Sequence, residues 1–361
     1  MKKSLLALAA LTAFAGVASA QSSVTLFGIV DLAARSVSNG SAGSMKTLST
    51  NGQASSRLGF RGVEDLGGGL RAGFWLEGDI SADVGGGGKT AANSNGSTAD
   101  PMTWTRRATV SLIGNFGEFR MGRDYTPTFS NIAAYDMFGY VGVSSLANIR
   151  SSLGTVNPVT GAVTGSGVTT AVRTNNSLEY FLPAMGGLYG NALVAAGENV
   201  QGNKYIGARL GYAAGPVNVS GAYGKTYKTA AMIDDLKVLN FGASFNLGFL
   251  TIQGSYEKTD YSISNQKLLT GGVQIPVGAG NIKLSATKAS SSNDVWAPTI
   301  LGAGYVYNLS KRSSLYVGYG RISNKGNNTF GSKFVASSGG PVGIKGGETS
   351  TGYDIGMRHD F

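Results

Sequence analysis

The stretch VLNFGASFNLGFLTIQGSYEK, residues 238–258, alternates apolar with polar or small side chains on both sides of a short glycine turn. Its apolar positions include Leu239, Phe241, Phe245, Leu250, Ile252 and Tyr256. A period of two places these side chains on one face of a β-strand and the polar ones on the other. The stretch therefore predicts a hairpin of two strands, each with one apolar and one polar face.

The same alternation recurs at 70–80, 281–288 and 353–361, and short glycine or asparagine links separate such segments. Eight longer polar links lie between seven short ones, at 38–53, 83–101, 124–172, 199–204, 229–236, 262–266, 291–298 and 324–348. In an up-and-down barrel, short turns lie at one rim and long loops at the other. The sequence predicts an all-β fold, a 16-stranded antiparallel transmembrane β-barrel in which the first strand, 24–36, pairs with the last.

The composition agrees with a membrane barrel. Hydrophobic residues make up 42 % of the chain, and the 56 glycines follow no collagen-like period. Beyond the N-terminal leader, no run approaches the ~20 apolar residues that a membrane helix needs. A soluble β-sandwich shows the same alternation in single segments, so the alternating link lengths are what favour the barrel. There are no cysteines, which excludes disulfides and cysteine metal sites.

Residues 1–20 have the pattern of a secretory signal peptide. Lys2 and Lys3 precede an apolar stretch, and Ala18-Ser19-Ala20 forms a cleavage site. We expect residues 21–361 to form a single exported domain.

The link 124–172 is the longest connection and lies between the predicted strands 118–123 and 173–180. A connection of this length without regular structure is uncommon in a compact fold and is usually functional. We predict that it folds into the lumen of the barrel and narrows the pore.

The sequence does not support enzyme chemistry. A nucleophilic hydrolase would need a histidine beside a serine nucleophile. The single histidine, His359, lies on an apolar strand face and is expected to be an interfacial side chain at the barrel rim. No carboxylate cluster has metal-ligand spacing, and the glycine-rich links follow strands without opening a helix. The basic residues are dispersed along an exported chain, which argues against nucleic-acid binding. We therefore predict neither a catalytic site nor a metal or cofactor.

The basic residues favour a charged lumen. Arg57, Arg61, Arg71, Arg209 and Lys283 lie on the polar faces of predicted strands. A charged side chain on the lipid face costs about 2–4 kcal/mol near the bilayer midplane, so these residues must face water or a partner. With 20 acidic residues against 30 basic ones, not all can pair. The alternative to a net basic lumen is that each of these residues pairs with a carboxylate on the barrel wall and serves only structure.

Several stretches resemble the Gram-negative porins of the β-proteobacterial branch: QSSVTLFGIVD at 21–31, SRLGFRGVEDLGGGL at 56–70, NFGEFRMGR at 115–123, RTNNS at 173–177, and Phe361. The resemblance implies a sixteen-stranded barrel, a homotrimer, and passive diffusion of small ions and hydrophilic solutes. It also implies a location in the outer membrane of a Gram-negative bacterium, in contact with outer-membrane lipid and lipopolysaccharide. In this family a terminal aromatic such as Phe361 is the signal for the outer-membrane assembly machinery.

The resemblance also implies a constriction in which wall arginines face acidic residues of the third loop. Arg57 matches the first arginine of that cluster and Arg173 the last. The middle one is Arg106 by the family pattern and Arg107 by strand alternation, and both remain candidates. Asp136 matches a loop acid, and Glu77 is expected to pair with one of the arginines.

The loop departs from the enteric branch of the family in one place. Phe138-Gly139-Tyr140-Val141 stands where that branch has Pro-Glu-Phe-Gly, and the missing glutamate favours anion over cation preference. A solute-specific channel would need an aromatic track, for which Trp75 and Trp104 are too few. An adhesin or structural anchor would have a plugged lumen and no conductance.

Overall fold

The computed structural model describes residues 23–86, 102–150, 170–200, 202–227, 235–261, 264–291, 297–325 and 347–361. The predicted signal peptide, residues 1–20, lies outside these ranges. Residues 151–169 of the predicted constriction loop lie outside them as well.

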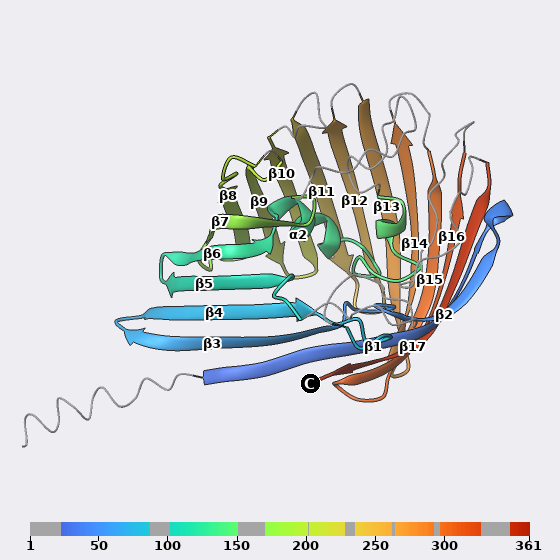
Figure 1. Ribbon diagram of the computed structural model, residues 1–361, viewed down its shortest axis with the longest axis horizontal. Coiled ribbons are helices and arrows are strands. Elements are labelled where there is room, and N and C mark those ends of the chain that lie inside the picture. The colour runs from blue at the N-terminus through green and yellow to red at the C-terminus, as the bar shows by residue number, and fades with distance from the viewer. Residues whose placement is uncertain are drawn as a thin grey trace, which may run out of the picture.

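The described residues form one antiparallel sheet of seventeen strands, sixteen of which close a barrel. The strands are β1 (Ser23–Asn39), β2 (Ser44–Thr50), β3 (Arg57–Gly67), β4 (Leu70–Asp79), β5 (Arg107–Gly114), β6 (Gly117–Tyr125), β7 (Arg173–Phe181), β8 (Leu188–Ala195), β9 (Tyr205–Ala214), β10 (Val217–Thr226), β11 (Leu236–Asn246), β12 (Thr251–Tyr261), β13 (Ser264–Val277), β14 (Gly280–Ser291), β15 (Thr299–Asn308), β16 (Ser313–Ser323) and β17 (Thr349–Asp360). Strand β1 closes the ring, because it pairs with β17 on one side and β3 on the other (Figure 1).

Two predicted links differ from the structure. The link 38–53 contains β2, which pairs with β1 from Leu32↔Thr50 to Ser38↔Ser44. This strand lies at the rim and needs no continuous apolar face, so its polar sequence reads as a loop. The link 262–266 is shorter than expected, because β13 already begins at Ser264.

The predicted alternation is confirmed along the strands. On β11, Phe241 is 53 % exposed on the outer face, whereas its neighbour Asn240 is fully buried. On β12, Ile252 is exposed while Ser255 and Glu257 are buried. The barrel therefore has an apolar outer face and a polar inner one. Among the described residues, no helix has the length and apolarity that crossing a membrane requires.

The predicted unstructured link 124–172 contains a helix. Strand β6 continues to Tyr125, and α2 (Pro127–Ala134) follows at once. Thr126 caps α2, because its Oγ1 accepts a hydrogen bond from the amide of Phe129 at 3.3 Å, and Pro127 occupies the first helical position. Both features start helices. A short 3₁₀ turn, η2 (Leu146–Asn148), comes later in the link.

We call residues 126–150 the β6–β7 segment. Its helix packs against β9, β10 and β11. Asn131 Nδ2 donates to Asn240 Oδ1 at 2.8 Å, and the Tyr135 hydroxyl lies 2.7 Å from Ser220 Oγ. Gly242 permits this contact, because a Cβ at that position would overlap the Tyr135 ring. The helix is thus held against the buried, polar face of the sheet.

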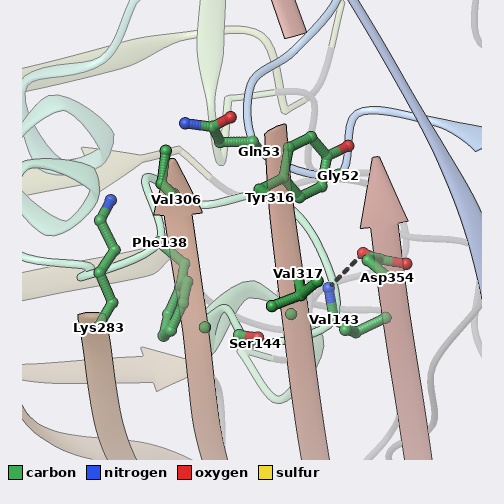
Figure 2. A pocket seen from close by; sticks show the side chains of 12 residues that line it. Gly52, Gln53, Phe138, Val143, Ser144, Lys283, Val306, Tyr316, Val317 and Asp354 are labelled. Carbon is green, nitrogen blue, oxygen red and sulfur yellow. Dashed lines mark hydrogen bonds between the residues drawn. The ribbon is translucent and has the colours of Figure 1, made fainter. Parts of the chain in front are cut away.

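The later part of the segment reaches the strands on the other side of the ring. Figure 2 shows Val143 and Ser144 beside β15, β16 and β17, where the amide of Val143 donates to Asp354 Oδ2 at 3.2 Å. Ser144 Oγ lies within hydrogen-bond distance of the carbonyl oxygens of Ala303 and Tyr319, at 3.1 and 2.9 Å. Val143 and Ile149 also belong to a buried apolar cluster with Val37, Leu268, Ala289, Ile300 and Ile322.

Candidate functional site

The arginines singled out in the sequence come together where strands meet the longer links. Arg57 begins β3, Arg173 begins β7, and Arg106 immediately precedes β5. These strands run in the same direction in the antiparallel sheet, so their first residues lie at the same end of the barrel. The last residues of β4 and β6, Asp79 and Tyr125, lie at that end as well.

Glu77 and Asp79 hold Arg106 at this end. Arg106 Nε lies 2.5 Å from Glu77 Oε1, and its Nη1 lies 2.9 Å from Asp79 Oδ1. Arg57 approaches the same Glu77 oxygen at 3.4 Å, while Trp75 Nε1 donates to Glu77 Oε2 at 3.0 Å. Glu77 therefore pairs with two arginines and is largely neutralised by the nearer one.

Tyr125 connects Arg106 and Arg173. Its hydroxyl oxygen accepts from Arg106 Nη2 at 2.9 Å and from Arg173 Nη2 at 2.8 Å. The Arg173 guanidinium also lies 4.3 Å from the centre of the Tyr125 ring. Within the described ranges, Arg173 forms no ion pair and its Nε has no hydrogen-bond partner. Its positive charge is held by a neutral phenol and not by a carboxylate.

Arg106 and Arg107 both contact residues of the polar face, through different partners. Arg107 is the first residue of β5 and shares the buried face with Thr109, as the alternation predicted. Its Nε lies 3.3 Å from Asp124 Oδ2, and its guanidinium lies 4.5 Å from the centre of the Trp75 ring. Arg106 precedes the strand, so the alternation does not apply to it, and both side chains reach the same side of the wall.

Asp136 lies inside the β6–β7 segment. It is 5 % exposed, and its carboxylate accepts hydrogen bonds from the amides of Phe138 and Tyr140 and from the Ser145 hydroxyl. Burial raises the pKa of the Asp136 carboxyl, while these hydrogen bonds act in the opposite direction. No ion pair of Asp136 with an arginine occurs among the described residues. Asp136 therefore stabilises the turn that contains Phe138 and Tyr140.

A cavity of about 950 Å³ joins these groups. Its lining includes five arginines and two carboxylates, namely Arg35, Arg57, Arg106, Arg173, Arg358, Asp79 and Asp83. Arg35 pairs with Asp354, and Arg358 pairs with Asp360. Of the remaining groups, Arg57 and Arg106 pair with Glu77 and Asp79, whereas Arg173 and Asp83 form no ion pair among the described residues.

Aromatic side chains of β6 and of the β6–β7 segment line the same cavity. The rings of Tyr125 and Phe129 stack with centres 4.9 Å apart, and Tyr140 meets Phe129 edge-on at the same distance. Tyr125 and Asp79 were not among the predicted site residues. The position of Asp79, two residues after Glu77 on the same polar face, was the available signal for it. Trp104 lies elsewhere, beside Phe60.

Known proteins resemble this chain over most of its length. The profile of the Gram-negative porin family matches residues 7–327 of the chain. The chain belongs to the Gram-negative porins. This porin is 37 % identical to outer membrane porin protein 32 of Delftia acidovorans, over the whole length of both chains. It is 28 % identical to an outer membrane porin protein of Bordetella pertussis, over 88 % of this chain and 93 % of that one.

A solved structure extends the likeness to three dimensions. An anion-selective porin from Comamonas acidovorans superposes with a TM-score of 0.80 and 34 % identity, over 94 % of this chain and all of that one. Porins are channels and not enzymes. This porin therefore forms a water-filled channel in the outer membrane through which small hydrophilic solutes and ions diffuse passively.

Proposed function

We propose that this porin passes small anions in preference to cations, and that Arg57, Arg106, Arg107 and Arg173, with Glu77, line the narrowest part of the channel. The observation that carries the proposal is that Arg173 forms no ion pair among the described residues. Its guanidinium lies in the cavity beside the neutral Tyr125, with no ion-paired carboxylate in the described chain. Such a charge is available to a passing anion.

The magnitude of the effect follows from electrostatics. Unit charges a few ångströms apart interact by about 1 kcal/mol in water and about 4 kcal/mol at an effective dielectric constant of 20. A narrow, wet pore lies between these limits, and charged rings at such a point set ion preference. Since about 1.4 kcal/mol is a tenfold change, each unpaired arginine shifts the anion-to-cation ratio several-fold.

The β6–β7 segment, in this proposal, lies across the lumen and forms one side of the constriction. Its hydrogen bonds with Asn240 on β11 and Asp354 on β17 support this, because both partners belong to the buried face of strands far from β6. Asp136 contributes by stabilising the turn at Phe138 and Tyr140. The negative charge that faces the arginines comes from Glu77.

Family membership supports the remaining parts of the proposal. The porin works as a homotrimer without catalytic activity, in contact with outer-membrane lipid and lipopolysaccharide. Residues 1–20 direct its export, residues 21–361 form the barrel domain, and Phe361 is read by the outer-membrane assembly machinery. The pairing of Phe361 with Gly28 on β1 gives this residue a place at the seam of the barrel.

Single-channel recording tests the proposal. The purified porin in a planar bilayer with a potassium chloride gradient is expected to give a reversal potential that reports chloride preference. The preference should be strongest in dilute salt, because the Debye length falls to about 3 Å at 1 M. Potassium preference, or a chloride preference that is the same at every salt concentration, would contradict it.

A further inference from the structure

Five consecutive strands, β10 to β14, carry one lysine each near the rim where the longer links join the strands. We call Lys225, Lys237, Lys258, Lys267 and Lys288 the lysine row. Each lysine has a buried neighbour along its strand, such as Glu257 and Thr259 beside Lys258. Successive side chains on a strand point to opposite faces, so the lysines point outward.

The register places lysines directly opposite one another. Lys225 on β10 is the partner of Lys237 on β11, and Lys258 on β12 is the partner of Lys267 on β13. Directly opposed residues have Cβ atoms about 4.5–5.5 Å apart, and like charges at such positions destabilise a sheet. Two such pairs on adjoining strands indicate that something anionic compensates them.

Carboxylates of the protein compensate only part of this charge. Asp235 lies 2.6 Å from Lys225 Nζ, and Asp260 lies 2.8 Å from Lys258 Nζ. Lys237, Lys267 and Lys288 form no ion pair in the part of the chain that the structure describes. Each opposed pair therefore keeps a lysine whose charge the protein does not neutralise.

The row lies at the border of the apolar outer face. The outward residue two positions closer to the barrel centre is apolar or aromatic on every one of these strands: Tyr223, Leu239, Tyr256, Leu269 and Ala286. A border between an apolar band and a polar rim is where lipid headgroups meet a membrane protein, and lysine extends its ammonium group to that level. On other strands near the same rim, the outward positions include uncharged Ser36 on β1 and Val194 on β8 and single arginines, Arg123 on β6 and Arg321 on β16, so the lysine row is distinguished by its opposed lysines.

We propose that the lysine row is a binding site for membrane lipid whose headgroup bears phosphomonoester groups. A phosphomonoester carries up to two negative charges near neutral pH and three acceptor oxygens, which suits two opposed ammonium groups better than a singly charged phosphodiester does. The inference rests on the proposed contact with outer-membrane lipid and specifies its site. It does not depend on the anion preference of the pore.

Thermal unfolding of the intact porin in nanodiscs tests the site. The discs contain phosphatidylcholine alone, or phosphatidylcholine with a minor fraction of phosphatidic acid or of phosphatidylglycerol. Phosphatidic acid should raise the unfolding temperature of the wild type more than phosphatidylglycerol does. Equal effects of the two anionic lipids would overturn the preference for a phosphomonoester.

The variant Lys267→Gln separates binding from folding, since it keeps the Lys258–Asp260 pair. In phosphatidylcholine alone it should unfold at a higher temperature than the wild type, because the repulsion is removed. With phosphatidic acid the order should reverse, and native mass spectrometry should show about fivefold weaker binding of that lipid. An unchanged gain of stability in Lys267→Gln would overturn the proposal.

Lys311→Gln is the matched control, because Lys311 is an exposed lysine in a short turn at the opposite rim. It should bind phosphatidic acid like the wild type, and an equal loss would mean that only overall charge matters. Inorganic phosphate added to phosphatidylcholine discs should have little effect, and an equal rise in unfolding temperature would make free phosphate the ligand. Reversal potentials of Lys267→Gln should equal those of the wild type. The proposal on lipid binding and the proposal on anion preference are therefore tested independently.

Discussion

Arg150 and Glu257 form a buried, two-point ion pair between the β6–β7 segment and β12. Arg150 Nε lies 2.6 Å from Glu257 Oε1, and its Nη2 lies 3.1 Å from Oε2. Burial lowers the pKa of the Arg150 guanidinium, but the Glu257 carboxylate and the Tyr140 hydroxyl more than offset this and raise it above its ordinary value. Glu257 also accepts from Asn240, so the pair belongs to the same network as α2.

Removing Arg150 should loosen the segment. Arg150→Ala leaves Glu257 buried without its cation, and breaking such a pair costs about 3–5 kcal/mol. We expect a lower unfolding temperature and larger fluctuations of the single-channel current. Replacement of both residues, Arg150→Leu with Glu257→Leu, should restore most of the stability, because no buried charge is left. A quiet, fully stable Arg150→Ala channel would show that the pair does not hold the segment.

Shortening the segment should widen the pore. Deleting residues 136–150 removes the contacts of Val143 and Arg150 but leaves β6 and β7 intact. We expect the barrel to fold and the single-channel conductance to rise. The control removes the same number of residues from the rim link 324–348 and should change conductance little. Equal changes in the two deletions would exclude the segment as the constriction.

Neutralising Arg57 and Arg173 together should abolish or reverse the chloride preference. The double variant Arg57→Gln with Arg173→Gln removes two positive charges and leaves Arg106 as the only arginine that pairs with Glu77 and Asp79 among the described residues, so the carboxylates of the cluster outnumber its arginines. Reversal potentials in a dilute potassium chloride gradient measure the change. Lys311→Gln, at the opposite end of the barrel wall, is the control and should keep the wild-type value. If the double variant also keeps the wild-type reversal potential, the arginine cluster does not set the selectivity.

The seam of the barrel should depend on Phe361. Its amide donates to the Gly28 carbonyl and its carbonyl accepts from the Gly28 amide, both at 3.0 Å, while its ring covers Gly28. Deleting Phe361 removes both hydrogen bonds and the ring contact, and we expect less folded, heat-modifiable porin in the outer membrane. Phe361→Leu keeps the backbone bonds and should be milder. Normal amounts of folded porin from the deletion would contradict this role.

Gly28→Ala probes the same seam from β1. A Cβ at Gly28 would overlap the tip of the Phe361 ring and lie 2.8 Å from the backbone oxygen of Arg57. The ring can move but the backbone cannot easily do so, so we expect a lower unfolding temperature than in the wild type. A variant as stable as the wild type would mean that the ring is free to leave the seam.

The sequence by itself determined the barrel, because a strand with lipid on one face and water on the other needs a side-chain period of two. That period placed Glu77, Arg107 and Arg209 on the polar face, and Phe241 and Ile252 on the apolar one. It is a local property and needs no knowledge of distant partners. It failed where the membrane imposes no apolar face, at β2 on the rim and at α2 inside the segment.

Only the tertiary structure decided which charges meet. Arg106 lies outside the strand period, and its partners Glu77 and Tyr125 come from other strands. Asp136 is an acid like Glu77, yet its carboxylate accepts hydrogen bonds from its own turn, from the Tyr140 amide and the Ser145 hydroxyl, and pairs with no arginine among the described residues. The opposition of Lys258 and Lys267 depends on the register of β12 against β13. Pairings of this kind depend on distances between residues far apart in the chain, which a one-dimensional pattern does not contain.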